Sequence, residues 1–204
     1  MLSSCVIILV GNRSYRSLPQ ALKILTIYFN IDLLFSLIEF TLGKLHTPNL
    51  FLMNIQIPIE YAFFTIALSY WITNERIRTI LFYSIPIFTL LCITLFLTIE
   101  DFFAFSNISR PILTTLLLFC SVYVLITILK DTSTTVTSQS RFWISSGVLI
   151  YNGGNATFFL MMHYLGLVSH DAVMIAWVFH NIIGASAYIL FMVGFLCQQT
   201  ISKS

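Results

Sequence analysis

Four polar residues lie deep inside apolar stretches of the sequence, and their residue types could support chemistry there. They are two carboxylates, Asp32 and Glu60, one amide, Asn155, and one imidazole, His180. A charge at the centre of a membrane helix costs about 2.5–3.5 kcal/mol on insertion scales, so such residues face a cavity or a partner, or stay protonated. Here the carboxylates could carry protons or coordinate a cation, and the imidazole could be a proton-sensitive member of the same group.

The composition of the chain is that of a protein in a lipid bilayer. Of its 204 residues, 58% are hydrophobic and 9% are charged, and the mean hydropathy is +0.92. Because a soluble globular domain is about 25% charged, this chain has too little polar surface to cover itself in water. The net charge of +2 is too small and too dispersed for nucleic-acid binding. The cysteines lack metal or redox spacing and are expected to be buried apolar side chains: Cys5, Cys92, Cys120 and Cys197.

The apolar stretches predict the fold. A membrane-spanning helix needs about 20 mostly apolar residues. The sequence therefore predicts one all-α transmembrane domain over residues 1–204, a polytopic bundle of seven spans with a short first span. The approximate bounds of the spans are 1–11, 19–42, 50–72, 78–98, 110–130, 142–166 and 171–197.

The basic residues predict the orientation of these spans. Eight of the ten Lys and Arg residues fall in or beside the odd-numbered connections or in the C-terminal tail: Arg13, Arg16, Lys23, Arg76, Arg78, Lys130, Arg141 and Lys203. The other side holds only Lys44 and Arg110, together with three acidic residues. By the positive-inside rule, the N-terminus is outside and the C-terminus is cytoplasmic.

Helical rise places the four polar residues at a similar depth. Each lies about nine to thirteen residues into its span, which at about 1.5 Å per residue is near the middle of the bilayer. We therefore predict a midplane polar site that is open to the outside. Its expected ligand- or proton-binding residues are Asp32, Glu60, Tyr151, Asn155, Trp177, His180 and Asn181, with Glu39 and Asn54 as secondary members nearer the outer face. Two alternatives stay open: a buried network that only fixes helix packing, and a chance agreement in depth between residues on different faces.

The segment YNGGN, residues 151–155, is predicted to be helical although its composition is typical of a turn. Backbone groups in hydrocarbon must be satisfied internally, so an open turn at this depth would be costly. Gly147 and Gly154 lie seven residues apart and would let a neighbouring helix approach closely. The expected neighbour is the last span, which carries a similar stripe of Trp177, His180 or Asn181, Gly184 and Tyr188.

No residue pattern predicts catalysis. The last span has no lysine for a retinal Schiff base and no second histidine a turn away from His180 for a zinc site. No phosphate-binding loop or serine-nucleophile motif occurs, and we expect no metal or cofactor. A paired-carboxylate reaction that uses Asp32 and Glu60 stays open.

The last two predicted spans contain the segments FWISSGVLIYNGGNATFF and AWVFHNIIGASAYILFMVGF. With them, the layout of the chain resembles uncharacterised bacterial seven-helix integral membrane proteins, which are small and have short loops. The resemblance implies a sensory input module of the 7TM receptor-like kind that signals to kinases or cyclases. Because CQQTISKS follows the last span and ends the sequence, the signal is expected to pass to a separate protein.

Three hypotheses for the function follow. The first is a sensor or receptor-like protein of the bacterial inner membrane, in which an unknown small ligand, a proton or a lipid reaches the polar site from outside. Its signalling partner would contact the Arg76–Arg78 or the Lys130–Arg141 connection at the cytoplasmic face. The first alternative is a small proton- or cation-coupled transporter. The second is a structural or assembly subunit of the membrane, whose polar residues only lock helices together.

Overall fold

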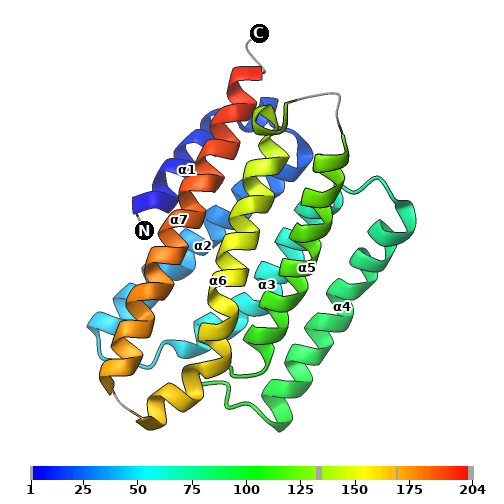
Figure 1. Cartoon of the computed structure of the whole chain (residues 1–204). Helices are drawn as coiled ribbons and strands as arrows, with labels where there is room; N and C mark the ends of the chain where they lie inside the picture. Colours follow the sequence, from blue (N-terminus) through cyan, green and yellow to red (C-terminus); the bar gives the residue numbers. More distant parts are fainter. Residues whose placement is uncertain (1, 132–134, 169, 202–204) are drawn as a thin grey trace. The chain divides into compact units, whose positions relative to one another are not determined.

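The computed structural model describes residues 2–131, 135–168 and 170–201, without the side chains of residues 2–4, 157, 161–168, 170 and 199–201. Every regular element in this part of the chain is a helix, which confirms the prediction of an all-α fold (Figure 1). Seven α-helices and two short 3₁₀ helices follow one another: α1 Leu2–Arg13, η1 Tyr15–Ser17, α2 Gln20–Lys44, α3 Leu50–Ser69, α4 Glu75–Thr98, α5 Ser109–Lys130, η2 Val136–Ser138, α6 Ser140–Val168 and α7 His170–Ile201.

Five of these helices are long and apolar enough to cross a membrane, within the residues that the structure describes. They are α2, α3, α4, α5 and the part of α7 from Asp171 to Gln198. The sequence placed spans at all five, and their observed bounds differ from the predicted bounds by a few residues. That residues 1–11 and 142–166, which correspond to α1 and α6, also cross a membrane stays a prediction, as does the orientation of the termini.

The chain divides into two compact units, residues 1–109 and 110–204, each with its own dense set of internal contacts. In the first unit, consecutive helices pack in pairs. Tyr28 of α2 meets Phe64 of α3, with ring centroids 5.0 Å apart at 68°. Tyr61 of α3 packs against Phe88 of α4 with ring centroids 4.5 Å apart at 52°, and its hydroxyl lies 2.7 Å from that of Ser84. These aromatic contacts join α2 to α3 and α3 to α4.

The connections of the first unit show why its helices end where they do. At the end of α2, His46 adopts a left-handed backbone with φ 55°. The N–H of Thr47 donates to the carbonyl of Leu42 at 3.0 Å, and the N–H of His46 donates to that of Gly43 at 3.2 Å. This is a Schellman motif, which satisfies the last carbonyls of a helix. At the start of α4, the side chain of Asn74 accepts the first free N–H groups, as an N-cap does.

The second unit is dominated by α6 and α7, which run side by side in opposite directions (Figure 1). The YNGGN segment lies inside the continuous helix α6, as predicted. A hydrogen bond joins the start of α6 to the last turns of α7: the hydroxyl of Ser140 donates to the Gln198 side chain at 3.2 Å. On another face of α6, Gly153 lies close to Leu118 of α5. The long α6–α7 contact is therefore the element that positions the candidate site of this unit.

Candidate functional site

A hydrogen bond between two helices forms the centre of the candidate site. Nδ1 of His180 in α7 lies 2.9 Å from Oδ1 of Asn155 in α6. Because the amide oxygen can only accept, the imidazole donates from Nδ1 in this arrangement. Asn155 is fully buried and His180 is half-buried. A polar pair of this kind gives α6 and α7 one defined register.

Aromatic side chains surround the imidazole of His180. Phe158 stacks on it with centroids 5.0 Å apart and planes 21° apart, while Trp177 stands edge-on at 5.2 Å and 89°. Phe159 and Tyr151 approach at 5.6 Å and 6.0 Å. We call these four rings with His180 and Asn155 the His180 cluster. Tyr151, Phe158 and Phe159 belong to α6 and Trp177 belongs to α7, so the cluster lies along the contact between these two helices.

A buried cation lies beside this cluster. The guanidinium of Arg110, at the start of α5, sits over the ring of Phe159 at 5.6 Å from its centroid, and Arg110 is only 6% exposed. A cation over an aromatic face is attracted by the ring quadrupole. Phe159 therefore contacts both the guanidinium of Arg110 and the ring of His180.

Part of the hydrogen-bonding capacity along α6 is unused among the described residues. Nδ2 of Asn155, Oδ1 of Asn152 and Oγ of Ser145 are buried there without a hydrogen-bond partner. The amide nitrogen of Asn152 donates to the carbonyl of Val148 at 2.9 Å. A buried polar atom without a partner costs about 1–3 kcal/mol. A small polar molecule that accepted from Asn155 or donated to Asn152 would remove this cost.

Glycines set the distance between α6 and α7. A Cβ on Gly147 would lie 2.5 Å from Cε1 of Phe191 and 3.2 Å from the carbonyl oxygen of Ala187. A Cβ on Gly154 would lie 3.0 Å from two carbons of Ile183. At Gly184, by contrast, the nearest atom is Cε2 of Tyr151 at 3.9 Å, an ordinary contact distance.

Gly194 of this interface was not among the sequence predictions, whereas Ala187 belongs to the small-residue segment GASA, residues 184–187, that was predicted on the last span. A Cβ on Gly194 would come within 2.9 Å of Ile144 and 3.2 Å of the Ser140 carbonyl. Ala187, whose carbonyl meets Gly147, lies seven residues before Gly194. The same seven-residue spacing of small residues was noted for Gly147 and Gly154, so it could have revealed this second pair.

The structure distinguishes His180 from its neighbour Asn181. The side chain of Asn181 is exposed, and it donates to the carbonyl of Trp177 in its own helix at 2.8 Å. His180, Asn155, Tyr151 and Trp177 are the predicted site residues that the second unit brings together.

The two predicted carboxylates belong to the first unit. Tyr28 of α2 faces Phe63 and Phe64 of α3 with centroids 6.0 Å and 5.0 Å away. Because the two helices are antiparallel, four residues forward along α2 correspond to about four residues back along α3. Asp32 therefore lies at the level of Glu60, which is buried at 7% exposure, whereas Asp32 is half-buried. That these carboxylates and the His180 cluster form one site stays a prediction.

Asn54, predicted as a secondary site residue, holds a loop of the first unit. Its Nδ2 donates to the carbonyls of Phe102 and Ala104, each at 2.8 Å, and its Oδ1 accepts from the hydroxyl of Ser106 at 2.7 Å. Asn54 is 2% exposed. We call this arrangement the Asn54 clamp, which fixes the connection that follows α4.

Two acids near the predicted outer face have further contacts. The carboxylate of Glu100 accepts the N–H groups of Ile108 at 2.7 Å and Ser109 at 3.3 Å, and also the Ser109 hydroxyl, so it caps the start of α5. Glu39 accepts from Asn49 at 3.1 Å through its backbone carbonyl.

The donor set of the His180 cluster suits hydrogen bonding and ring stacking. In the described part of the chain, no three side chains of His, Cys, Asp or Glu are grouped so that they could hold a metal ion. Comparison of the chain with protein-family models, curated proteins and solved structures finds no match.

Proposed function

We propose that this protein is a multi-pass sensor of the cell membrane in which the His180 cluster is the ligand-responsive element. The observation that supports the proposal is the fully buried amide of Asn155, which bonds to His180 through its oxygen while its Nδ2 has no acceptor among the described residues. A small polar ligand that engaged this amide would compete with or complete the hydrogen bonding between α6 and α7. The ligand would then favour one register of the helix pair over another.

A path for the signal leads from the cluster to the predicted cytoplasmic end of the same helix pair. There, Sγ of Cys197 in α7 lies 2.9 Å from the carbonyl of Ser138 in η2. Arg141 at the start of α6 forms an ion pair with Asp131 at 2.8 Å. A shift of α7 against α6 would therefore move the Lys130–Arg141 connection, where we propose that a separate signalling protein binds.

Labelling of single cysteines tests the proposal. We would replace the four native cysteines by alanine and introduce Asn155→Cys and His180→Cys one at a time in intact cells. A small charged reagent that cannot cross the membrane would be added from outside. We expect labelling at both positions, slower at 155 because Asn155 is fully buried. Ile182→Cys, on an exposed apolar position of α7, is the lipid-facing control and should not react.

The opposite result would refute the sensor proposal. If both cysteines stay protected in a folded protein, no ligand reaches the cluster from outside, and the polar residues serve helix packing. Protection of cysteines at positions 32 and 60 as well would leave a structural or assembly subunit as the function.

A second candidate function is a proton- or cation-coupled transporter. The observation that favours it is the shared level of Asp32 and Glu60 on two neighbouring helices. Asp32→Cys and Glu60→Cys, labelled in the same way, test whether that level is reached by water. Labelling of the cysteines at positions 32 and 60, with protection of those at 155 and 180, would favour a transporter over a sensor.

A further inference from the structure

The turn between α1 and α2 is a basic element that the proposed function does not use. Residues 1–31 contain Arg13, Arg16 and Lys23 but no Asp or Glu. Arg13 ends α1, and Arg16 lies in η1, so both guanidinium groups belong to the same short connection. By the positive-inside rule this connection is predicted to face the cytoplasm. The turn therefore carries local positive charge at one end of two apolar helices.

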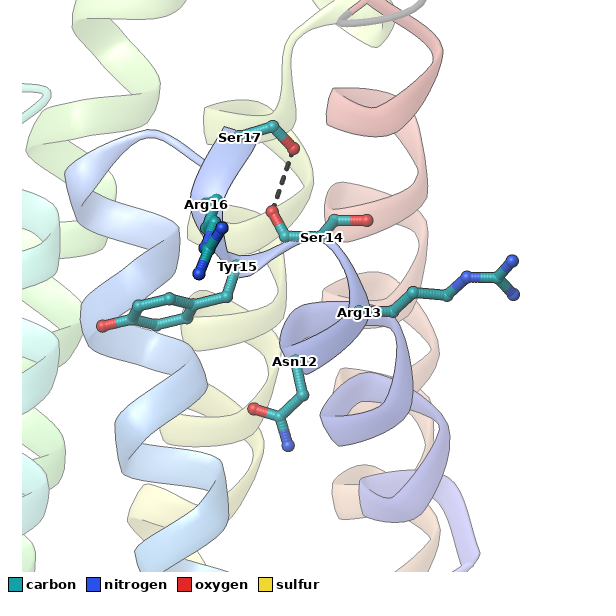
Figure 2. A pocket seen from close by; sticks show the side chains of 6 residues that line it. All are labelled: Asn12, Arg13, Ser14, Tyr15, Arg16 and Ser17. Atoms are coloured by element: carbon teal, nitrogen blue, oxygen red, sulfur yellow. Dashed lines mark hydrogen bonds between the residues drawn. The ribbon is translucent and has the colours of Figure 1, made fainter.

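The turn forms a hollow of about 340 Å³ (Figure 2). Its lining residues are Asn12, Arg13, Ser14, Tyr15, Arg16 and Ser17. Ligand sites occupy roughly 300–1,000 Å³, so the hollow has room for a small polar group. Figure 2 shows Tyr15 and Arg16 on one side of the turn and Arg13 extending from the other. The ammonium of Lys23 lies 6.0 Å from the Tyr15 ring, which adds a third cation near the same wall.

Hydrogen bonds hold this turn in place. The amides of Asn12 and Asn30 bond to each other in both directions at 3.2 Å, and Asn30 also donates to the carbonyl of Thr26 at 2.7 Å. Within the turn, the hydroxyl of Ser17 donates to the Ser14 carbonyl at 2.9 Å. The end of α1 is thereby fixed against α2, and the hollow is formed before any ligand arrives.

The charge of this turn is not balanced by acidic residues, in contrast to the other predicted cytoplasmic connections. Arg78 pairs with Glu75 at 3.6 Å, and Arg141 pairs with Asp131 at 2.8 Å. For Arg13 and Arg16, no carboxylate lies within ion-pair distance among the described residues. Both side chains are exposed. They are therefore available to an external anion.

We propose that the hollow binds the phosphate headgroup of an anionic phospholipid at the cytoplasmic face of the membrane. Arginine recognises phosphate through its planar set of N–H donors. Tyrosine is enriched at the level of lipid headgroups, where Tyr15, which is 37% exposed, would lie. The acyl chains of the lipid would extend along the apolar surface beside α1 and α2. A soluble phosphate has no acyl chains and would not contact this surface. This proposal depends on the membrane location of the chain but not on its sensor function.

Lipid retention by the purified full-length protein tests the proposal. Native mass spectrometry would count phosphatidylglycerol and phosphatidylcholine of identical chain length that stay bound. The variant Arg13→Gln/Arg16→Gln removes the two arginine charges of the turn that lines the hollow. The variant Arg76→Gln/Lys130→Gln removes two charges from other predicted cytoplasmic connections and is the matched control. A hydrogen bond to a charged group contributes about 1.5–3 kcal/mol, and about 1.4 kcal/mol is tenfold, so the loss of one such bond to the phosphate should lower retention of phosphatidylglycerol at least about tenfold in the first variant.

The result that supports the proposal is selective loss of phosphatidylglycerol in the hollow variant, with phosphatidylcholine and the control variant unchanged. Equal retention of phosphatidylglycerol by the hollow variant and the wild type would overturn it. Displacement of the lipid by millimolar inorganic phosphate would also overturn it, because the site would then be one for a soluble anion. The wild-type protein provides a test that needs no variant: retention of phosphatidylglycerol should fall as salt rises, and retention that is independent of salt contradicts the proposal.

Discussion

The substitution Gly147→Ala should destabilise the protein, although alanine is the better helix former. In the structure, the added Cβ would lie 2.5 Å from Cε1 and 2.7 Å from Cδ1 of Phe191. The favourable distance between two carbon atoms is about 3.5–4.0 Å. Phe191 is 5% exposed, so its ring has little space in which to move. The carbonyl oxygen of Ala187, a backbone atom, lies at 3.2 Å on the same side.

The expected magnitude follows from two opposing terms. Overpacking of a close contact costs about 1–3 kcal/mol, and the contact at Gly147 is near the upper end because part of it is backbone. Replacement of glycine by alanine inside a helix contributes up to about 1 kcal/mol in the other direction. We therefore expect Gly147→Ala to lower the free energy of unfolding by about 2 kcal/mol. Gly184→Ala, whose Cβ would meet its nearest atom only at 3.9 Å, should raise it by up to about 1 kcal/mol.

Equilibrium unfolding in sodium dodecyl sulfate, followed by circular dichroism, measures this difference between the two variants. A third variant, Gly147→Ala/Phe191→Leu, removes the ring that the new methyl group meets. The loss of stability in this double variant should be smaller than the sum of the losses in Gly147→Ala and Phe191→Leu, which would show that the two positions are coupled. The reasoning is refuted if Gly147→Ala and Gly184→Ala have the same stability, or if Gly147→Ala is the more stable of the two.

Three further predictions concern other parts of the molecule. Asn54→Ala should lower the free energy of unfolding by about 2–3 kcal/mol, since three hydrogen bonds are lost and the Ser106 hydroxyl stays buried. Hydrogen exchange of residues 99–108 should accelerate in this variant, and unchanged exchange there would contradict the clamp. His46→Gly should raise the free energy of unfolding by about 1 kcal/mol, because glycine adopts the left-handed backbone of the Schellman motif without steric cost. A lower midpoint of thermal unfolding in this variant would argue against the steric cost at His46. A double-mutant cycle with Asn155→Ala and His180→Ala should give a coupling energy of about 0.6–1.7 kcal/mol, as expected for hydrogen bonds between membrane helices. Additive effects of the two substitutions would mean that the bond is absent in the membrane.

The sequence alone was sufficient to predict the helical elements. Hydropathy is a local property, so a run of about 20 apolar residues identifies a membrane-length helix whatever it packs against. The YNGGN segment was predicted to be helical for a similarly local reason, because its backbone groups need partners within the helix. The seven-residue spacing of Gly147 and Gly154 also gave the close approach of α7, since residues seven apart share one face of a helix.

The partners of individual polar side chains were decided only by tertiary structure. His180 and Asn181 are adjacent in sequence, yet one bonds to Asn155 across the interface and the other bonds to its own helix. Asn54 bonds to a loop about 50 residues away, which no local pattern contains. A rotation of one helix by a single residue turns a side chain by about 100°. The register and rotation of packed helices, which depend on contacts along their whole length, therefore determine which polar groups meet, whereas local composition determines only that a helix forms.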